Sequence, residues 1–235
     1  MASAQPPSSD PAHRMSAPPL PLNASELLDF AIAHFRSRTA IEMNGTRVSY
    51  GLLGRRVRSL AQGLLDSGIR AGDRVAIVLP MSIEAVIAFH AVLRIGAIAV
   101  QHSDREPMMR LSREFADYSP VAVIIAEYRL SALAGLDEQA RPKTVITVQA
   151  PERPKATPRR LTFTGALAEI AKASGKGVMR VAAPPKAPAQ LPLSFGTRAK
   201  FKDLLGSAPL PQDYPYPDPS DLAALVYEGL SLIHI

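Results

Sequence analysis

The side chains of this sequence that could carry chemistry are scattered along the chain. It has no cysteines, which excludes a disulfide scaffold, a thiolate zinc site and a cysteine nucleophile. Histidine is the other strong zinc ligand, and a histidine zinc site needs a helical pair four residues apart or a close cluster. Neither pattern occurs among the five histidines, which are His13, His34, His90, His102 and His234. The sequence therefore predicts no metal site.

Two of these histidines lie where a ligand role is conceivable. His90 falls in an apolar helix expected over residues 82–94, and we interpret it as a packed or snorkelling side chain. His102 comes just past a strand expected over residues 97–100. Ligands bind at the carboxyl ends of parallel strands. We nevertheless interpret His102 as a structural residue of a loop.

The acidic residues have simpler explanations than catalysis. Asp73 follows Gly72 and is typical of a turn, Glu84 lies in the first turn of a helix, and Asp104 resembles a helix cap. No two carboxylates are placed together by local spacing, so a glycosidase-type site has no support. The residues alone predict no catalytic group.

One glycine-rich segment invites a phosphate-loop interpretation. Gly175-Lys176-Gly177 lacks the earlier glycine that a Walker loop requires, because Ile170 stands there. It also lacks the Ser or Thr that should follow the lysine. We therefore expect no nucleotide binding at this segment.

The basic character of the chain is concentrated in residues 151–210, which hold eleven Lys and Arg against three Asp and Glu. Phosphate contacts with nucleic acid would be one use of such a segment. The only aromatic residues there are Phe163, Phe195 and Phe201, which do not form a stacking platform. We expect a solvated surface and no nucleic-acid partner, with an anionic membrane surface as the alternative.

Helices and strands alternate in the first two thirds of the chain. The composition, 47% apolar and 20% charged over 235 residues, fits a globular protein of one or two domains. Short β-branched runs separated by amphipathic segments predict an α/β fold with a parallel sheet flanked by helices. The strands are expected at residues 74–79, 97–100, 121–126 and 144–148, and the helices at 51–68, 82–94, from about 107 and at 130–140. The loops after Leu79, Val100, Ala126 and Val148 are the candidate ligand sites.

Two signals mark the start of ordered structure. Residues 1–22 are rich in Pro, Ser and Ala and predict a disordered leader without the apolar core of a secretory signal. Asn23 stands three residues before Glu26, which is typical of a helix start. Asn44-Gly45 separates two short runs and predicts a hairpin.

The chain divides into five segments by these patterns. Residues 23–148 form the α/β subdomain, and residues 149–220, which hold twelve prolines, form an irregular insertion with short helical patterns at 164–173 and 201–205. Residues 221–229 contain a further strand, and residues 230–235 are a separate tail. No apolar run reaches the roughly 18 residues that a membrane-spanning helix needs. We expect a cytoplasmic location.

Several motifs in residues 46–126 resemble a known superfamily. They are Val48-Ser49-Tyr50, Gly72-Asp73-Arg74-Val75-Ala76-Ile77, Leu79-Pro80-x-Ser82-x-Glu84 and Leu93-Arg94-x-Gly96-Ala97. In this order they resemble the N-terminal part of the adenylate-forming, AMP-binding superfamily. Val100-Gln101-His102, Phe201-x-Asp203-Leu204-Leu205 and Asp218-Pro219-x-Asp221 are most similar to bacterial long-chain fatty-acid–CoA ligases.

The resemblance implies a fold and a reaction. The fold would be an incomplete N-terminal part of the large adenylate-forming domain. The full-length parent would use ATP, Mg²⁺ and coenzyme A to convert a fatty acid to acyl-CoA through an acyl-adenylate, with peripheral contact to the inner face of the membrane. The glycine-rich phosphate loop of that family should begin just after Tyr227, and the sequence Glu228–Ile235 does not contain it. No catalytic, cofactor-binding or metal-binding residue is therefore carried over to this chain.

The tail suggests why the loop is missing. Leu-Ser-Leu-Ile-His-Ile at residues 230–235 back-translates to a transposon-end adapter used in sequencing libraries. We therefore expect a truncated ligase fragment that is itself inactive, with an exposed sheet edge at its last strand. The alternatives are a carrier-protein-linked adenylation domain, an aryl-CoA ligase, or a non-catalytic binding module with a basic arm.

Overall fold

The computed structural model describes residues 23–149 and 196–227. The expectations for the leader 1–22, for Gly175-Lys176-Gly177, for the pattern at 164–173 and for the tail lie outside the described residues, as do His13 and His234. The elements are α1 (Ala24–Phe35), β1 (Thr39–Met43), β2 (Thr46–Ser49), α2 (Tyr50–Asp66), β3 (Arg74–Leu79), α3 (Ile83–Arg94), β4 (Ile98–Ser103), α4 (Met108–Tyr118), β5 (Ala122–Ala126), η2 (Glu127–Leu133), η3 (Glu138–Ala140), β6 (Thr144–Val148), β7 (Thr197–Lys200), α6 (Phe201–Leu204) and β8 (Ala224–Val226).

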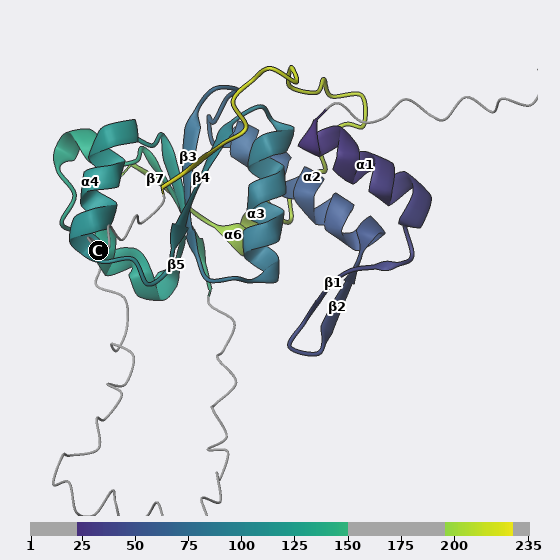
Figure 1. Ribbon diagram of the computed structural model, residues 1–235, viewed down its shortest axis with the longest axis horizontal. Coiled ribbons are helices and arrows are strands. Elements are labelled where there is room, and N and C mark those ends of the chain that lie inside the picture. Colours follow the sequence, from purple (N-terminus) through teal and green to yellow (C-terminus); the bar gives the residue numbers. More distant parts are fainter. Residues whose placement is uncertain (1–22, 150–195, 228–235) are drawn as a thin grey trace, which may run out of the picture.

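The main sheet confirms the expected α/β architecture. Six parallel strands lie in the order β7-β6-β5-β3-β4-β8. Helices α1, α2 and α3 lie on one side of this sheet and α4 on the other (Figure 1). The β1–β2 hairpin is separate and antiparallel, and Asn44 and Gly45 in its turn both have positive φ, as the sequence predicts.

The period-two pattern of the strands builds two cores. Val75, Ile77 and Leu79 of β3 pack with the helices α2 and α3, whereas Ala76 and Val78 pack with the α4 side. Successive side chains of a strand point to opposite faces, so an all-apolar strand serves both cores at once. This explains why the apolar run at residues 74–79 was a reliable strand signal.

Helix starts follow their capping residues. The Ser49 and Ser82 side chains accept hydrogen bonds from Leu52 N and Ala85 N, which satisfies first-turn donors of α2 and α3. One sequence expectation about an α-helix is corrected. Residues 130–140 form the short 3-10 segments η2 and η3 instead of an α-helix, because Gly135 separates them and their hydrogen bonds run between residues three apart.

Asn23 caps α1 and also ties it to the far end of the chain. Its Oδ1 accepts from Ser25 N at 3.0 Å and Glu26 N at 2.9 Å, and its Nδ2 donates to Pro217 O at 3.2 Å. We expect Asn23→Ala to lower the free energy of unfolding by about 1 kcal/mol. Asn23→Asp keeps the acceptor and favours the helix dipole, so it should cost less. Thermal unfolding of the three proteins followed by circular dichroism tests this, and equal losses for both variants would contradict the capping role.

Strand β4 is longer than the sequence suggested. It continues through Ser103, because its ladder with β3 extends to the pairs Val78–His102 and Leu79–Ser103. The last three residues are polar, so no apolar pattern marked them. His102 therefore lies within a strand, and the expectation that it belongs to a loop is wrong.

Strand β7 is an unexpected element in the segment interpreted as irregular. Its sequence Thr-Arg-Ala-Lys is polar because it lies at the edge of the sheet, and it pairs only with β6 among the described strands. Gly196 precedes it and lies so close to β6 that a Cβ there would be 2.1 Å from Lys143 O. The short helix α6 then confirms the pattern expected at residues 201–205.

The last strand, β8, lies at the other edge of the sheet. It covers Ala224–Val226, within the segment 221–229 that was expected to contain it, and pairs with β4 from Ala99–Ala224 to Gln101–Val226. β8 thus has a neighbouring strand, β4, on one side. On its other side no strand of the described part of the chain is present, and Val226 is 70% exposed.

A buried arginine places the segment that leads to β8. Arg94, at the end of α3, is 3% exposed and donates from Nη2 to Tyr214 O at 2.7 Å and from Nη1 to Pro215 O at 3.0 Å. Its guanidinium lies over the Tyr216 ring, 4.3 Å from the centroid, and 3.7 Å from the carboxylate of Asp29 on α1. The segment crosses the top of the helices in Figure 1, in yellow, before it enters the sheet.

No helix in residues 23–149 and 196–227 combines the length and the apolar character that crossing a membrane requires.

Candidate functional site

Four parallel strands end at one edge of the sheet. β3, β4, β5 and β8 end at Leu79, Ser103, Ala126 and Val226, and sheets of this kind bind ligands at such a carboxyl edge. Polar side chains gather there below Tyr227, the residue after β8. This edge is therefore the candidate functional site.

Five side chains form what we call the carboxyl-edge cluster: His102, Glu106, Arg110, Glu114 and Tyr118. They come from the end of β4, the turn that follows it and one face of α4. The His102 side chain is 0% exposed, and the side chains of Glu106 and Glu114 are 9% and 8% exposed. Two carboxylates are thus held almost without water, which requires compensating partners.

The partners of these carboxylates are divided between their two oxygens. Arg110 Nε lies 2.9 Å from Glu106 Oε1 and 2.8 Å from Glu114 Oε1. His102 Nδ1 lies 3.0 Å from Glu106 Oε2 and 3.1 Å from Glu114 Oε2, while its Nε2 is 2.8 Å from Tyr118 Oη. The hydrogen bond to Glu114 raises the pKa of Arg110, which therefore stays charged. Burial, and then the nearby negative charges, raise the pKa of the Tyr118 hydroxyl, which therefore stays neutral.

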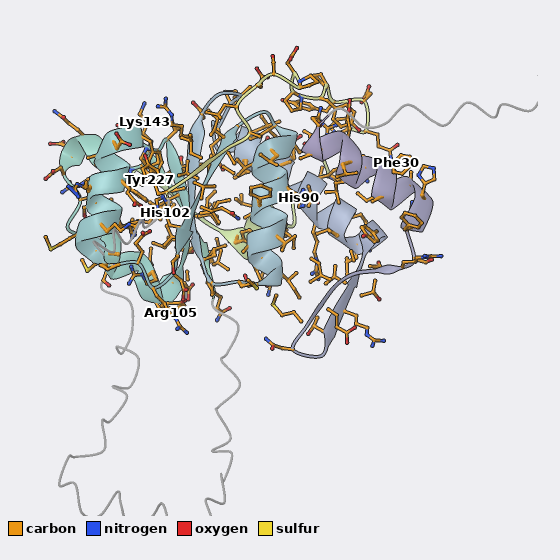
Figure 2. The ribbon with its side chains drawn as sticks, in the orientation of Figure 1. Phe30, His90, His102, Arg105, Lys143 and Tyr227 are labelled. Atoms are coloured by element: carbon orange, nitrogen blue, oxygen red, sulfur yellow. The ribbon has the colours of Figure 1, made fainter. Side chains whose placement is uncertain are left out.

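Tyr227 closes the cluster on the β8 side. Its ring is stacked on His102, with centroids 6.0 Å apart and planes at 17°, and its hydroxyl donates to Asp117 Oδ2 at 2.6 Å. Arg110 Nη2 donates weakly to Tyr227 O at 3.5 Å. Figure 2 shows His102 and Tyr227 together beside α4. The cluster thereby positions the point at which the chain leaves β8.

The turn between β4 and α4 is held from η2. Arg129 Nη2 donates to Glu106 O at 2.6 Å, and the Tyr128 hydroxyl donates to Asp104. The expectation that Asp104 caps α4 is wrong, because the N-cap residue is Pro107 and no side chain caps this helix. Asp104 instead binds the turn to η2.

The other residues singled out in the sequence are not part of the carboxyl-edge cluster. Asp73 accepts from Arg70 N in a turn and Glu84 lies in the first turn of α3, both as expected. His90 is partly buried on α3, edge-on to Phe89, and burial lowers its pKa. Figure 2 places it apart from His102, on the α3 side of the sheet. Its packing agrees with the sequence interpretation.

Sequence reasoning missed most of the cluster. His102, Glu106 and Glu114 bring one possible ligand atom each within 4.8 Å of the others, a grouping of one histidine with two carboxylates that the search for histidine patterns did not include. Glu106, Arg110, Glu114 and Tyr118 follow His102 at intervals of four residues. That regular spacing was a usable signal, because residues four apart share one face of a helix. Only the residues on α4 are helical, however, and His102 joins them because the chain turns between β4 and α4. That turn belongs to the tertiary structure.

The cluster suits binding and positioning. It offers the His102 imidazole and two carboxylates, which can bind a proton or a metal ion. It also offers the fixed positive charge of the Arg110 guanidinium. It offers no hydroxyl or amine nucleophile beyond the buried phenol. Its geometry therefore supports a role in fixing the sheet edge and the chain that follows Tyr227.

Tyr227 should ionise later than an ordinary tyrosine. Partial burial, and then the hydrogen bond to Asp117, raise its pKa from 10.0 to about 12. Because the pKa is higher in the folded chain, the stabilising contribution is complete below pH 10 and disappears as the pH rises through 12. In an absorbance titration of tyrosinate, we expect Tyr227→Phe to remove one late-titrating group.

Tyr216 provides the matched control. Its pKa is also raised to about 12, through burial and its bond to Asp29 at a different place in the fold. Tyr216→Phe should remove its own late step and leave that of Tyr227. An unchanged late absorbance in Tyr227→Phe would mean that the Asp117 contact does not persist in solution.

A protein-family model described as "AMP-binding enzyme" matches residues 28–227. The match runs from α1 to Tyr227 and so includes nearly all of the described residues.

Individual proteins match shorter stretches or share the fold. The acetyl-coenzyme A synthetase of Chromobacterium violaceum is 45% identical over 83 residues, which are 33% of this chain and 13% of that relative. The apo structure of MbtA from Mycobacterium smegmatis has a TM-score of 0.59 at 22% identity and covers 87% of this chain and 31% of its own. A protein from Rhodopseudomonas palustris described as a long-chain-fatty-acid CoA ligase has a TM-score of 0.52 at 21% identity and covers 80% of this chain and 37% of its own. The chain thus spans between 13% and 37% of the length of these three proteins.

Proposed function

Because the chain belongs to the AMP-binding enzyme family, we propose that it forms the N-terminal part of an ATP-dependent ligase that converts a fatty acid to its coenzyme A thioester. A carboxylate is a poor electrophile. In the proposed reaction it attacks the α-phosphorus of ATP, with Mg²⁺ as the counter-ion, and pyrophosphate leaves. The thiol of coenzyme A then attacks the acyl carbon of the adenylate and AMP leaves. The family match over residues 28–227 is the observation that carries this proposal.

The part that this chain takes in the ligase follows from its sheet edge. β8 pairs with β4 and delivers Tyr227 to the carboxyl edge, where the His102 ring and Arg110 contact it. A nucleotide-binding segment attached after Tyr227 would start from a fixed position, which lowers the entropy lost on ordering it. The described residues thus serve as the support of the site.

The choice of a fatty acid rests on the sequence motifs that resemble bacterial fatty-acid–CoA ligases. We propose a cytoplasmic protein with peripheral contact to the inner face of the membrane, because long-chain fatty acids partition into bilayers. The alternatives are a carrier-protein-linked adenylation domain and an aryl-CoA ligase. Both would catalyse the same first step, formation of an acyl-adenylate, with another acid.

The test begins with the coding DNA, read beyond the Tyr227 codon from an independent library. We expect an open reading frame that encodes a glycine-rich loop followed by a lysine. The protein from that frame should catalyse ATP–pyrophosphate exchange with hexadecanoate in preference to acetate, benzoate and amino acids. Exchange with benzoate or an amino acid alone would overturn the fatty-acid assignment. A confirmed stop codon after Ile235, with no exchange, would overturn the ligase proposal and favour the non-catalytic binding module.

A further inference from the structure

The carboxyl-edge cluster contains a buried oxygen without a donor. Glu114 Oε2 has no hydrogen-bond partner among the described residues, although the Glu114 side chain is only 8% exposed. It points at His102 Nδ1, which already bonds to Glu106 Oε2. One ring nitrogen carries at most one hydrogen, which cannot be directed at both carboxylates. A buried acceptor left in this state costs about 1–3 kcal/mol or more.

The contact of the other ring nitrogen is compatible with a lone pair on Nδ1. Nε2 lies 2.8 Å from the Tyr118 hydroxyl, whose oxygen can accept the Nε2 hydrogen. In that tautomer Nδ1 and the two inner carboxylate oxygens are three acceptors turned toward one point. Of the outer oxygens, Glu114 Oε1 accepts the Arg110 Nε hydrogen, and Glu106 Oε1 lies 2.9 Å from the same nitrogen in an ion pair. A cation at that point would satisfy all three acceptors.

The spacing of these atoms is that of metal ligands. Zinc binds imidazole nitrogen and carboxylate oxygen at about 2.0–2.2 Å, which places two such ligands about 2.9–3.4 Å apart at ordinary coordination angles. The observed Nδ1–Oε2 distances are 3.0 and 3.1 Å. All three atoms lie within 4.8 Å of one another.

The surroundings also match those of a metal site. Ligating histidines usually donate their other ring N–H to an acceptor, and ligating carboxylates are themselves hydrogen-bonded. Tyr118 supplies the first of these partners and Arg110 the second. The Phe115 and Tyr227 rings, with centroids 5.5 and 6.0 Å from that of His102, cover the imidazole.

We propose that His102 Nδ1, Glu106 Oε2 and Glu114 Oε2 bind one divalent transition-metal ion, with Zn²⁺ as the ion that this nitrogen and oxygen donor set fits. Three protein ligands leave a fourth position for water. The ion connects the end of β4, the following turn and α4 directly below Tyr227. Its role is structural, and the proposal does not depend on the ligase assignment.

The experiment uses the untagged 235-residue chain, freed of metal with a chelator and titrated with ZnCl₂ against a chromophoric competitor. We expect the chain to bind one equivalent of Zn²⁺ at the carboxyl-edge cluster. The Tm of the chain should be higher with Zn²⁺ than without it. Loss of a supporting partner alone weakens metal binding about 10–100-fold, so Glu114→Gln and Glu106→Gln should weaken it at least about 100-fold. Substitution with Co²⁺ should give visible absorption bands that both variants lose.

Matched controls separate the cluster from other sites on the chain. Glu138→Gln and His34→Gln change exposed residues of the same types, and they should retain the zinc affinity and the Co²⁺ spectrum. Equal zinc affinity in Glu114→Gln and the unchanged chain would overturn the proposal. So would a metal-free protein that neither binds Zn²⁺ nor shifts its Tm, with both His102 ring nitrogens protonated by NMR. That result would make the cluster an imidazolium between two carboxylates. If a glutamine variant fails to fold, the Co²⁺ spectrum and Tm shift of the unchanged chain decide.

Discussion

Phe115→Ala should lower the free energy of unfolding by about 3–5 kcal/mol, the range found when a buried phenylalanine is truncated. Phe115 is 0% exposed and lies between α4 and the sheet. Its ring contacts His102 and Tyr118, with centroids 5.5 and 5.6 Å away. Removing it both creates a cavity and loosens the two rings at the centre of the carboxyl-edge cluster. Urea unfolding followed by circular dichroism measures the change.

Met109 on the same helix supplies the control. Its side chain is 88% exposed, so Met109→Ala should change the free energy of unfolding by no more than about 0.5 kcal/mol. Phe115→Leu, which keeps most of the volume, should fall between the two. A loss below about 1 kcal/mol in Phe115→Ala would mean that α4 does not pack on the sheet as described.

Arg94→Met should lower the free energy of unfolding by about 3 kcal/mol. The substitution keeps an unbranched side chain as far as the position of Nε but leaves the carbonyls of Tyr214 and Pro215 without their donor. Hydrogen bonds from a charged group contribute roughly 1.5–3 kcal/mol each. Part of that loss is offset because the guanidinium no longer has to be desolvated. The same measurement applies, and proteolysis should cleave the segment 206–221 sooner in the variant.

An exposed arginine in another ion pair tests whether burial is the cause. Arg47 pairs with Glu42 at 3.1 Å on the hairpin, with side chains 70% and 56% exposed. Arg47→Ala should cost less than about 1 kcal/mol, as surface pairs do. Arg94→Lys should restore only part of the stability, because one ammonium cannot reproduce the fork that reaches both carbonyls. Equal losses in Arg47→Ala and Arg94→Met would contradict the assignment of Arg94 as an anchor.

The two predictions concern the two supports of the same strand. Arg94 holds the segment that enters β8, and Phe115 holds the cluster that contacts Tyr227 at its end. β8 itself has only three residues and one neighbouring strand in the described part of the chain. Its position therefore depends on these side chains more than on its own ladder.

Local patterns in the sequence were enough to predict most of the sheet and three of its helices. The run at residues 74–79 is apolar on both faces, Ser49 and Ser82 stand at true helix starts, and Asn44-Gly45 turns the hairpin. These signals are reliable because each depends on residues within one or two turns of each other. The family motifs lie in the same segments, which is why the family could be inferred from sequence.

What the sequence by itself determined was the alternation of elements, the parallel α/β class and the family. The tertiary structure alone decided that polar residues 101–103 continue β4, that residues 197–200 form an edge strand, and that a buried cluster exists. In each case the stabilising partner is distant in the chain or on another element. His102 is held in the sheet by β3, β7 pairs with β6, and Glu114 on α4 is buried against His102 of the sheet. A polar residue is buried only where such a partner satisfies it. Tertiary packing determines which partner a polar residue meets, so a local sequence pattern cannot predict its burial.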